Sequence, residues 1–172
     1  MSLFLVRHAE PLLDPRTNPA DWPLSPAGRR AAAGLQGAIP SGARWVSSIE
    51  RKAYETLLEA SPEAVTIGQE ERFGEVLRVE PFDDAVRERR RAWVEGRLDA
   101  RHEGWETPHE AAERFEAGVR GHVEDTGSLV VGTHGMVMTA WLVHARGQVS
   151  TAKAGAFWVG LDFPEVVRVD GL

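Results

Sequence analysis

The stretch that decides the fold is Leu3-Phe4-Leu5-Val6-Arg7-His8-Ala9-Glu10-Pro11, near the start of the chain. It opens with an apolar run of the kind that forms a buried strand, and the run ends in Arg-His. Such a strand aims a cation and an imidazole at the carboxyl edge of a sheet, where open α/β sheets bind ligands. The arginine favours an anion such as a phosphate, and the imidazole can act as base, metal ligand or nucleophile.

Length and composition limit the class of protein. The chain has 172 residues, of which 42% are hydrophobic and 27% charged, and we expect one globular domain over residues 1–172. It contains no cysteine, which excludes disulfides, thiolate catalysis and cysteine metal sites. The net charge of −6 argues against a nucleic-acid partner, and no apolar stretch is long enough to span a bilayer. We therefore expect a cytoplasmic protein with no membrane partner, and the oligomeric state stays open.

Apolar runs alternate with helix signals along the chain. Ser25-Pro26 and Thr107-Pro108 are typical helix starts, because each pairs a capping hydroxyl with a proline at the first helical position. The alternation predicts a three-layer α/β/α domain with a mainly parallel sheet and an antiparallel edge hairpin formed by the last two strands. Strands are expected at Leu3–Val6, Trp45–Val46, Val65–Ile67, Leu129–Val131, Phe157–Leu161 and Val166–Val169, and helices at residues 25–38, 51–60, 82–98, 107–124 and 135–145.

Polar residues of matching chemistry follow three of the predicted strands. Arg7 and His8 follow the first, Arg51 lies in the helix that starts after Ser47-Ser48, and His134 follows the strand near residue 130. In a parallel sheet these junctions share one edge, where helix N-termini add backbone N–H donors. The sequence therefore predicts a pocket for a dianionic phosphate.

Five short motifs, in the order in which they occur along the chain, resemble those of the histidine phosphatase superfamily, which are also called phosphoglycerate mutase-like proteins. The resemblance implies the fold of that family, with residues 76–106 as a short cap or insert. Two departures are Ala9 and Pro11, which replace the family's usual Gly and Thr. The matching segments are Leu5–Glu10, Leu24–Gly28 ("LTxxG"), Ser47–Thr56 ("SSxxxRAxxT"), Gly104–Thr107 with Arg114 ("GES" and its helix) and Val131–Gly135 ("SHG"), and Phe73–Glu75 stands where the family has "LxE".

The resemblance implies a role for each candidate residue. His8 would be the nucleophile that becomes phosphorylated, while Arg7, Arg51 and His134 would bind the phosphoryl oxygens. The chemistry agrees, because a nucleophilic histidine must be neutral and the cationic groups stabilise charge on the equatorial oxygens. His134 is counted with His8 among the catalytic residues.

Glu75 would protonate the leaving oxygen. A glutamate that acts as an acid near neutral pH needs a raised pKa, from burial or anionic neighbours. Glu71, Glu80 and Glu106 are the alternative acids if Glu75 has only a structural role.

The predicted function is a phosphoric monoester hydrolase that acts on a small phosphorylated metabolite through a phosphohistidine, with no metal and no cofactor. Three alternatives stay open: a phosphoglycerate mutase, a protein phosphohistidine phosphatase and a non-catalytic anion-binding module. A metal site of His8, His134 and Glu75 is disfavoured by the flanking arginines, which would repel a cation. The arginines of residues 87–101 form either a solvated helix face or a contact to a second anionic group.

Overall fold

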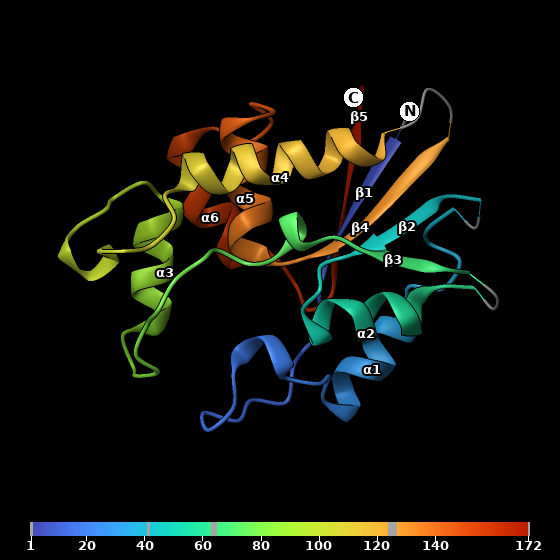
Figure 1. Cartoon of the computed structure of the whole chain (residues 1–172), viewed down its shortest axis with the longest axis horizontal. Coiled ribbons are helices and arrows are strands. Elements are labelled where there is room, and N and C mark those ends of the chain that lie inside the picture. The colour runs from blue at the N-terminus through green and yellow to red at the C-terminus, as the bar shows by residue number, and fades with distance from the viewer. Residues whose placement is uncertain (1, 41, 63–64, 124–126, 172) are drawn as a thin grey trace.

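A computed structural model describes residues 2–40, 42–62, 65–123 and 127–171 of the chain. Strands and helices alternate along most of the chain (Figure 1). The strands are β1 (Ser2–Arg7), β2 (Arg44–Ser47), β3 (Ile67–Gln69), β4 (Ser128–Thr133) and β5 (Glu165–Asp170), and the helices are α1 (Pro26–Ala33), α2 (Arg51–Ala60), α3 (Val86–Val94), α4 (Pro108–His122), α5 (Gly135–His144) and α6 (Ala154–Gly160). Short 3-10 helices lie at Pro19–Asp21, Glu71–Phe73, Ala100–His102 and Thr151–Lys153.

The strands form one sheet in the order β3-β2-β4-β1-β5. The pairs β3–β2, β2–β4 and β4–β1 are parallel, and β5 runs antiparallel to β1 at the edge. Arg7 pairs with Thr133, and Ser47 pairs with Gly132. Three strands therefore end level with one another, which brings the residues that follow them to one place.

Helices cover both faces of the sheet, with α1 and α2 on one side and α4, α5 and α6 on the other (Figure 1). Side chains alternate between the faces along β1: Leu3 and Leu5 pack under α4 and α5, while Phe4 and Val6 pack toward α2. Helix α5 is buried from Gly135 to Leu142, since the sheet, α4 and α6 surround it. The predicted three-layer α/β fold is confirmed.

The capping signals operate as expected. Ser25 Oγ accepts a hydrogen bond from Gly28 N at 2.9 Å, and Thr107 forms a complete capping box with Glu110. Gly28 also lies against the Glu10 backbone, where an added Cβ would come within 2.2 Å of the Glu10 carbonyl oxygen. This close approach holds the start of α1 against the segment that follows His8.

The predicted edge hairpin is wrong in one of its two strands. Residues 154–160 form α6, whose Phe157 and Trp158 pack on the main core, and only β5 is a strand. Contacts with α3 and α5 hold this segment as a helix, so the outer edge of β5 has no partner strand among the described residues. A short apolar run fits a buried helix as well as a strand, so local periodicity could not separate them.

Other boundaries shift in ways that local sequence explains. Helix α1 ends at Ala33 because Gly34 and Gly37 follow, and α3 covers only Val86–Val94 of the helix expected at residues 82–98. Strand β3 lies at residues 67–69 in place of the expected 65–67. The expected end of the helix from residue 107, at Glu124, lies outside the described residues.

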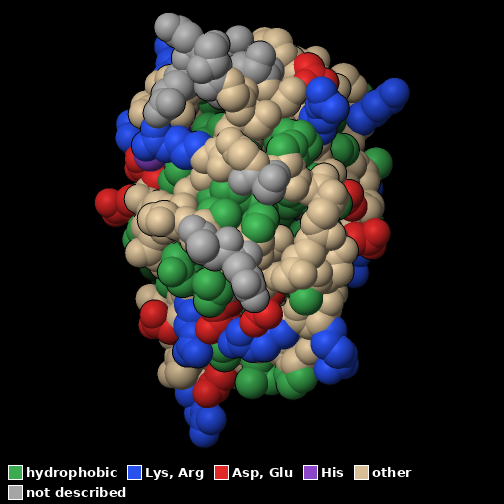
Figure 2. Space-filling model, turned by 90° about the vertical axis from the view of Figure 1, so that its right-hand side faces the viewer, with side chains coloured by type: hydrophobic (Ala, Val, Ile, Leu, Met, Phe, Trp, Pro, Cys, Tyr) green, Lys and Arg blue, Asp and Glu red, His purple; other side chains and the backbone are tan. Residues whose placement is uncertain are grey.

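Figure 2 views the molecule from the side on which the parallel strands begin. Positive and negative side chains are interspersed around this face, as expected for a solvated surface. Within the described ranges, no helix is both long and apolar enough to cross a membrane.

Candidate active site

A cavity of about 740 Å³ opens at the carboxyl ends of β1 and β4. Polar and charged groups line its inner part, among them Arg7, His8 and Glu75 from the predicted set. Its outer wall includes apolar side chains such as Phe82 and Leu77, which are 53% and 64% exposed. The cavity thus combines a polar base with an apolar mouth.

His8 lies at the base of this cavity in one defined tautomer. Its Nδ1 is 2.8 Å from the carbonyl oxygen of Ala9. A carbonyl oxygen only accepts, so Nδ1 carries the proton and the lone pair is on Nε2. Burial, and after it the proximity of His134 and of the Lys52 ammonium, holds the pKa of His8 well below its ordinary value. The ring is therefore neutral and nucleophilic at pH 7.

The residue after His8 is held by α2. Thr56 Oγ1 accepts from Ala9 N at 2.9 Å and donates to the Lys52 carbonyl oxygen at 2.7 Å. Since Ala9 also orients the His8 ring, Thr56 fixes the histidine indirectly. Thr56 occupies the final T of the "SSxxxRAxxT" match, and its role in this chain is to hold the backbone next to His8.

His134 packs against His8, with ring centroids 5.2 Å apart, and its side chain is fully buried. Its Nε2 lies 3.0 Å from Ser48 Oγ and 3.3 Å from Glu50 Oε1, whereas Nδ1 has no hydrogen-bond partner among the described residues. Burial lowers the pKa of His134 to about 4. His134 does not line the cavity directly but stands behind His8.

Lys52 and Glu50, which the sequence analysis did not select, both line the cavity. Their ammonium and carboxylate groups form a salt bridge, and Lys52 Nζ also donates to the Pro19 carbonyl oxygen at 2.8 Å. Burial disfavours the Glu50 carboxylate, but His134 and Lys52 outweigh this effect and lower its pKa to about 2. A buried cation and a buried anion therefore stand side by side next to the nucleophile.

The position of Arg51 differs from the prediction. Its guanidinium turns away from the cavity and pairs with Glu55 at 2.8 Å, and its side chain is 54% exposed. The expected convergence of Arg51 with Arg7, His8 and His134 is wrong, because on α2 the inward face carries Lys52 and Thr56, four positions apart. The motif itself indicates Lys52 in place of Arg51. If Ser47 is the first position of "SSxxxRAxxT", the R is the sixth position, and residue 52 is a lysine.

Arg7 is buried and leans on backbone acceptors. It donates to the Leu161 carbonyl oxygen at 2.6 Å, and its Cζ lies 3.5 Å from the centroid of the Phe163 ring. Burial lowers the pKa of Arg7 to about 10, so the group still carries its charge at pH 7. Its Nε is buried without a hydrogen-bond partner among the described residues, and remains a donor for a ligand.

Glu75 borders the cavity on the loop after the 3-10 helix Glu71–Phe73. Its Oε1 accepts from Val137 N, in the first turn of α5, at 3.1 Å, and its own N–H donates to Glu50 Oε1 at 2.7 Å. Burial raises the pKa of this carboxyl, but Arg78 and His134 outweigh burial and the net shift is downward. In the free protein, Glu75 therefore does not have the raised pKa that a general acid needs.

The residues that match "GES" and its helix, Glu106 and Arg114, support the loop that carries Glu75. Arg114 on α4 pairs with Glu106 at 2.7 Å and donates to the carbonyl oxygens of Arg72 at 2.7 Å and Glu75 at 3.3 Å. Thr133, at the end of β4, adds a hydrogen bond from Oγ1 to the Phe73 carbonyl oxygen at 2.9 Å. The loop is therefore fixed from both sides.

The other candidate acids lie in different surroundings. Glu106 is committed to Arg114, and Glu80 accepts from Arg78 at 3.0 Å and from Arg90. Glu80 lines the cavity, while Glu71 is exposed in the 3-10 helix before the Glu75 loop. Among the described residues no group of three His, Asp or Glu side chains is arranged to hold a metal ion.

The chain belongs to the histidine phosphatase superfamily (branch 1), whose sequence pattern matches residues 3–158. Its fold is similar to that of mycobacterial glucosyl-3-phosphoglycerate phosphatase, solved with inorganic phosphate, with 24% identity, a TM-score of 0.67, and coverage of 90% of this chain and 83% of that one. A phosphoglycerate mutase from Thermus thermophilus is also similar, with 25% identity, a TM-score of 0.63, and coverage of 99% and 93%. No curated protein matches the sequence.

Proposed function

We propose that this protein is a phosphatase that hydrolyses small phosphomonoesters through a phosphohistidine on His8, without a metal ion. The observation that carries the proposal is the state of His8. It is a buried neutral imidazole whose Nδ1 donates to the Ala9 carbonyl oxygen and whose Nε2 has no hydrogen bond to any described residue. The cations of Arg7 and Lys52 line the same cavity. Positive groups placed beforehand around the phosphoryl oxygens supply most of the catalysis in phosphoryl transfer.

In the first step, His8 Nε2 forms a bond to phosphorus while the bond from phosphorus to the leaving oxygen breaks. Glu75 donates the proton that the leaving oxygen needs. Its lowered pKa in the free protein is compatible with this role, because a bound phosphoryl dianion beside the carboxyl raises that pKa. In the second step, water attacks the phosphohistidine, Glu75 takes the proton of that water, and inorganic phosphate and neutral His8 are regenerated.

A mutase is the second candidate, favoured by the similarity to a phosphoglycerate mutase. The two reactions differ in the acceptor of the phosphoryl group: water in the phosphatase, and a second hydroxyl in the mutase. Incubation with 3-phosphoglycerate therefore separates them, since a phosphatase releases inorganic phosphate and a mutase produces the isomer.

The test of the phosphatase is rapid quench with labelled p-nitrophenyl phosphate. Wild type should hold acid-labile label on His8 and release phosphate after dialysis against EDTA, and His8→Gln should do neither while keeping the wild-type circular dichroism spectrum. Full turnover by His8→Gln, label on another residue, or activity that needs a divalent metal after dialysis would refute the proposal.

A further inference from the structure

Much of the exposed apolar surface of the described chain lies in the outer part of the active-site cavity. Of the eleven large apolar side chains that the structure leaves exposed, five line this one cavity. They come from three segments: Leu13 from the loop after β1, Leu77, Val79 and Phe82 from the loop before α3, and Phe163 from the turn before β5. Apolar side chains gathered on a cavity wall, in contrast to single scattered ones, mark a site for an apolar group.

We call Leu13, Leu77, Val79 and Phe82 the apolar wall. The wall is formed before any ligand binds, because a buried aromatic residue holds one of its members. Trp22 is 6% exposed and meets the Phe82 ring edge to face, with ring centroids 6.0 Å apart. The indole N–H of Trp22 donates to a backbone carbonyl oxygen at 2.9 Å, so its polar atom is satisfied away from the cavity.

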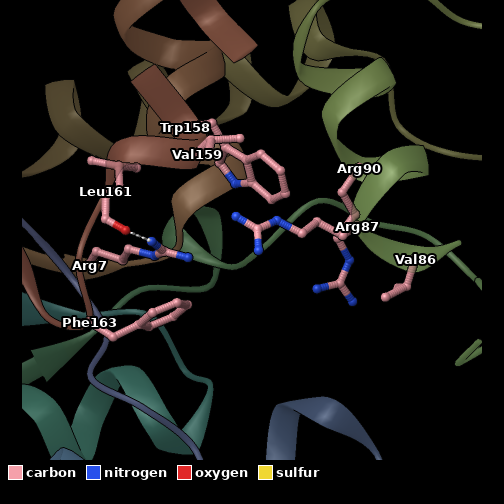
Figure 3. Close-up of a pocket in the computed structure, with 8 residues that line it drawn as sticks. All are labelled: Arg7, Val86, Arg87, Arg90, Trp158, Val159, Leu161 and Phe163. Carbon is pink, nitrogen blue, oxygen red and sulfur yellow. Dashed lines mark hydrogen bonds between the residues drawn. The ribbon is translucent and has the colours of Figure 1, made fainter. Parts of the chain in front are cut away.

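The apolar wall lies where the leaving group of a phosphomonoester has to lie. In an in-line displacement the leaving oxygen stands on the side of phosphorus opposite His8, and Glu75 is the residue proposed to protonate it. Leu77 is two residues after Glu75. At the inner end, the Phe163 ring lies 5.4 Å from the ring of His8, and Figure 3 shows Phe163 and Trp158 on either side of the Arg7 guanidinium. Apolar surface therefore continues from the nucleophile to the mouth.

The charged side chains beside the apolar wall neutralise one another. Glu80 accepts from Arg78 at 3.0 Å and from Arg90, and its side chain is only 9% exposed. Arg78 is also close enough to the Glu75 carboxylate to stabilise its charge. Two guanidinium groups are thus matched by two carboxylates, and Glu10 adds a further negative charge to the lining. An acidic leaving group therefore finds no unmatched cation among the described residues around this wall.

We propose that the apolar wall holds the leaving group of the substrate, and that the preferred substrates are phosphomonoesters of bulky, uncharged apolar alcohols or phenols. This inference rests on the proposed function for the place of the reacting phosphoryl group. The cavity of about 740 Å³ has room for such a group beside the phosphoryl group. The wall contributes to substrate preference and takes no part in the transfer itself.

Binding of non-hydrolysable phosphonates tests the inference without requiring turnover. Calorimetry would measure the series from methyl- to hexylphosphonate and the ω-carboxyalkylphosphonates of the same lengths. A fully buried methylene strengthens binding about fourfold, so a half-exposed wall should give about twofold for each methylene, or about thirtyfold over the series. A terminal carboxylate should weaken binding relative to the alkylphosphonate of the same length, because it leaves water without a cation to pair with.

Leu77→Ser combined with Phe82→Ser should reduce the gain over the series from about thirtyfold to less than about fivefold, with methylphosphonate bound as by wild type. The matched control combines Leu58→Ser with Leu98→Ser, since these side chains are similarly exposed and do not line the cavity. The control should keep the full gain. Circular dichroism spectra equal to that of wild type show that the variants are folded.

Equal binding across the wild-type series, a full gain in the Leu77 and Phe82 double variant, or tighter binding of the carboxyalkyl series would overturn the inference. A wild-type dimer in sedimentation velocity that the double variant dissociates would also overturn it, because a second copy of the chain would then cover the wall. Turnover of p-nitrophenyl phosphate by the same preparation reports on the proposed function separately. A chain-length gain without turnover keeps the wall as a binding site, and turnover without the gain removes this inference alone.

Discussion

Replacing Glu50 by glutamine should make the stability of this protein depend on pH in a specific way. The pKa of Glu50 is lowered from 4.5 to about 2, because His134 and Lys52 outweigh the opposing effect of burial. A tenfold change in proton affinity corresponds to 1.36 kcal/mol, so the displacement amounts to about 3 kcal/mol. A carboxylate whose pKa is lower in the folded state stabilises that state above pH 4.5, and the contribution disappears as the pH falls toward 2.

We therefore expect Glu50→Gln to lower the free energy of unfolding by about 3 kcal/mol at pH 7, the range for breaking a buried ion pair. For a chain of this length, that loss corresponds to a decrease in Tm of about 10 °C. Urea unfolding of wild type and variant at pH 7, 5, 4 and 3 measures the difference, which should shrink steadily below pH 4.5.

The matched control is Glu59→Gln on α2, the helix that Glu50 precedes, where Glu59 pairs with the half-exposed Arg29. An exposed pair contributes less than about 1 kcal/mol, so this variant should remain close to wild type. A Glu50→Gln difference that is the same at every pH, or one no larger than that of Glu59→Gln, would show that Glu50 is not held as a buried carboxylate.

Two further predictions concern activity. Lys52→Met should lower kcat/KM for p-nitrophenyl phosphate about 100-fold, the usual effect of removing one charge-stabilising donor, while Arg51→Met should change it less than about twofold; equal losses in steady-state assays would restore Arg51 to the site. Glu75→Gln should slow an alkyl phosphate about 100-fold or more but p-nitrophenyl phosphate much less, since a nitrophenolate hardly needs the proton; equal slowing of both substrates would assign Glu75 a structural role.

The parts of the fold that could be predicted are those fixed by neighbours in sequence. β1 follows from four apolar residues, and the helix starts at Ser25 and Thr107 follow from capping chemistry. The placement of His8 also follows, since it directly continues β1. The element that was mistaken, α6, is one whose state depends on its packing against α3 and α5. Contacts with α3, a helix about 60 residues earlier in the chain, cannot be derived from local sequence.

The site was predictable to the same extent. Strand ends located Arg7 and His8, but a helix start determines only which residues lie nearby and leaves their direction to tertiary packing. Arg51 and Lys52 are adjacent and both basic, but only Lys52 lines the cavity. Glu50 gave no signal, because a glutamate before a helix is common on surfaces, and its burial depends on His134 and on the Glu75 loop.

The Lys52–Glu50 pair changes how an anion would be held next to His8. An ammonium has three N–H donors, and on Lys52 one is directed to Glu50 and one to the Pro19 carbonyl oxygen, which leaves one for a ligand. Lys52 therefore acts as a point charge that Glu50 partly offsets, and it lacks the planar fork of an arginine. Arg7 commits Nη1 to backbone oxygens but keeps Nε and Nη2, two parallel donors on one edge. In the proposed phosphatase, bidentate recognition of the phosphoryl group therefore depends on Arg7 and not on Lys52.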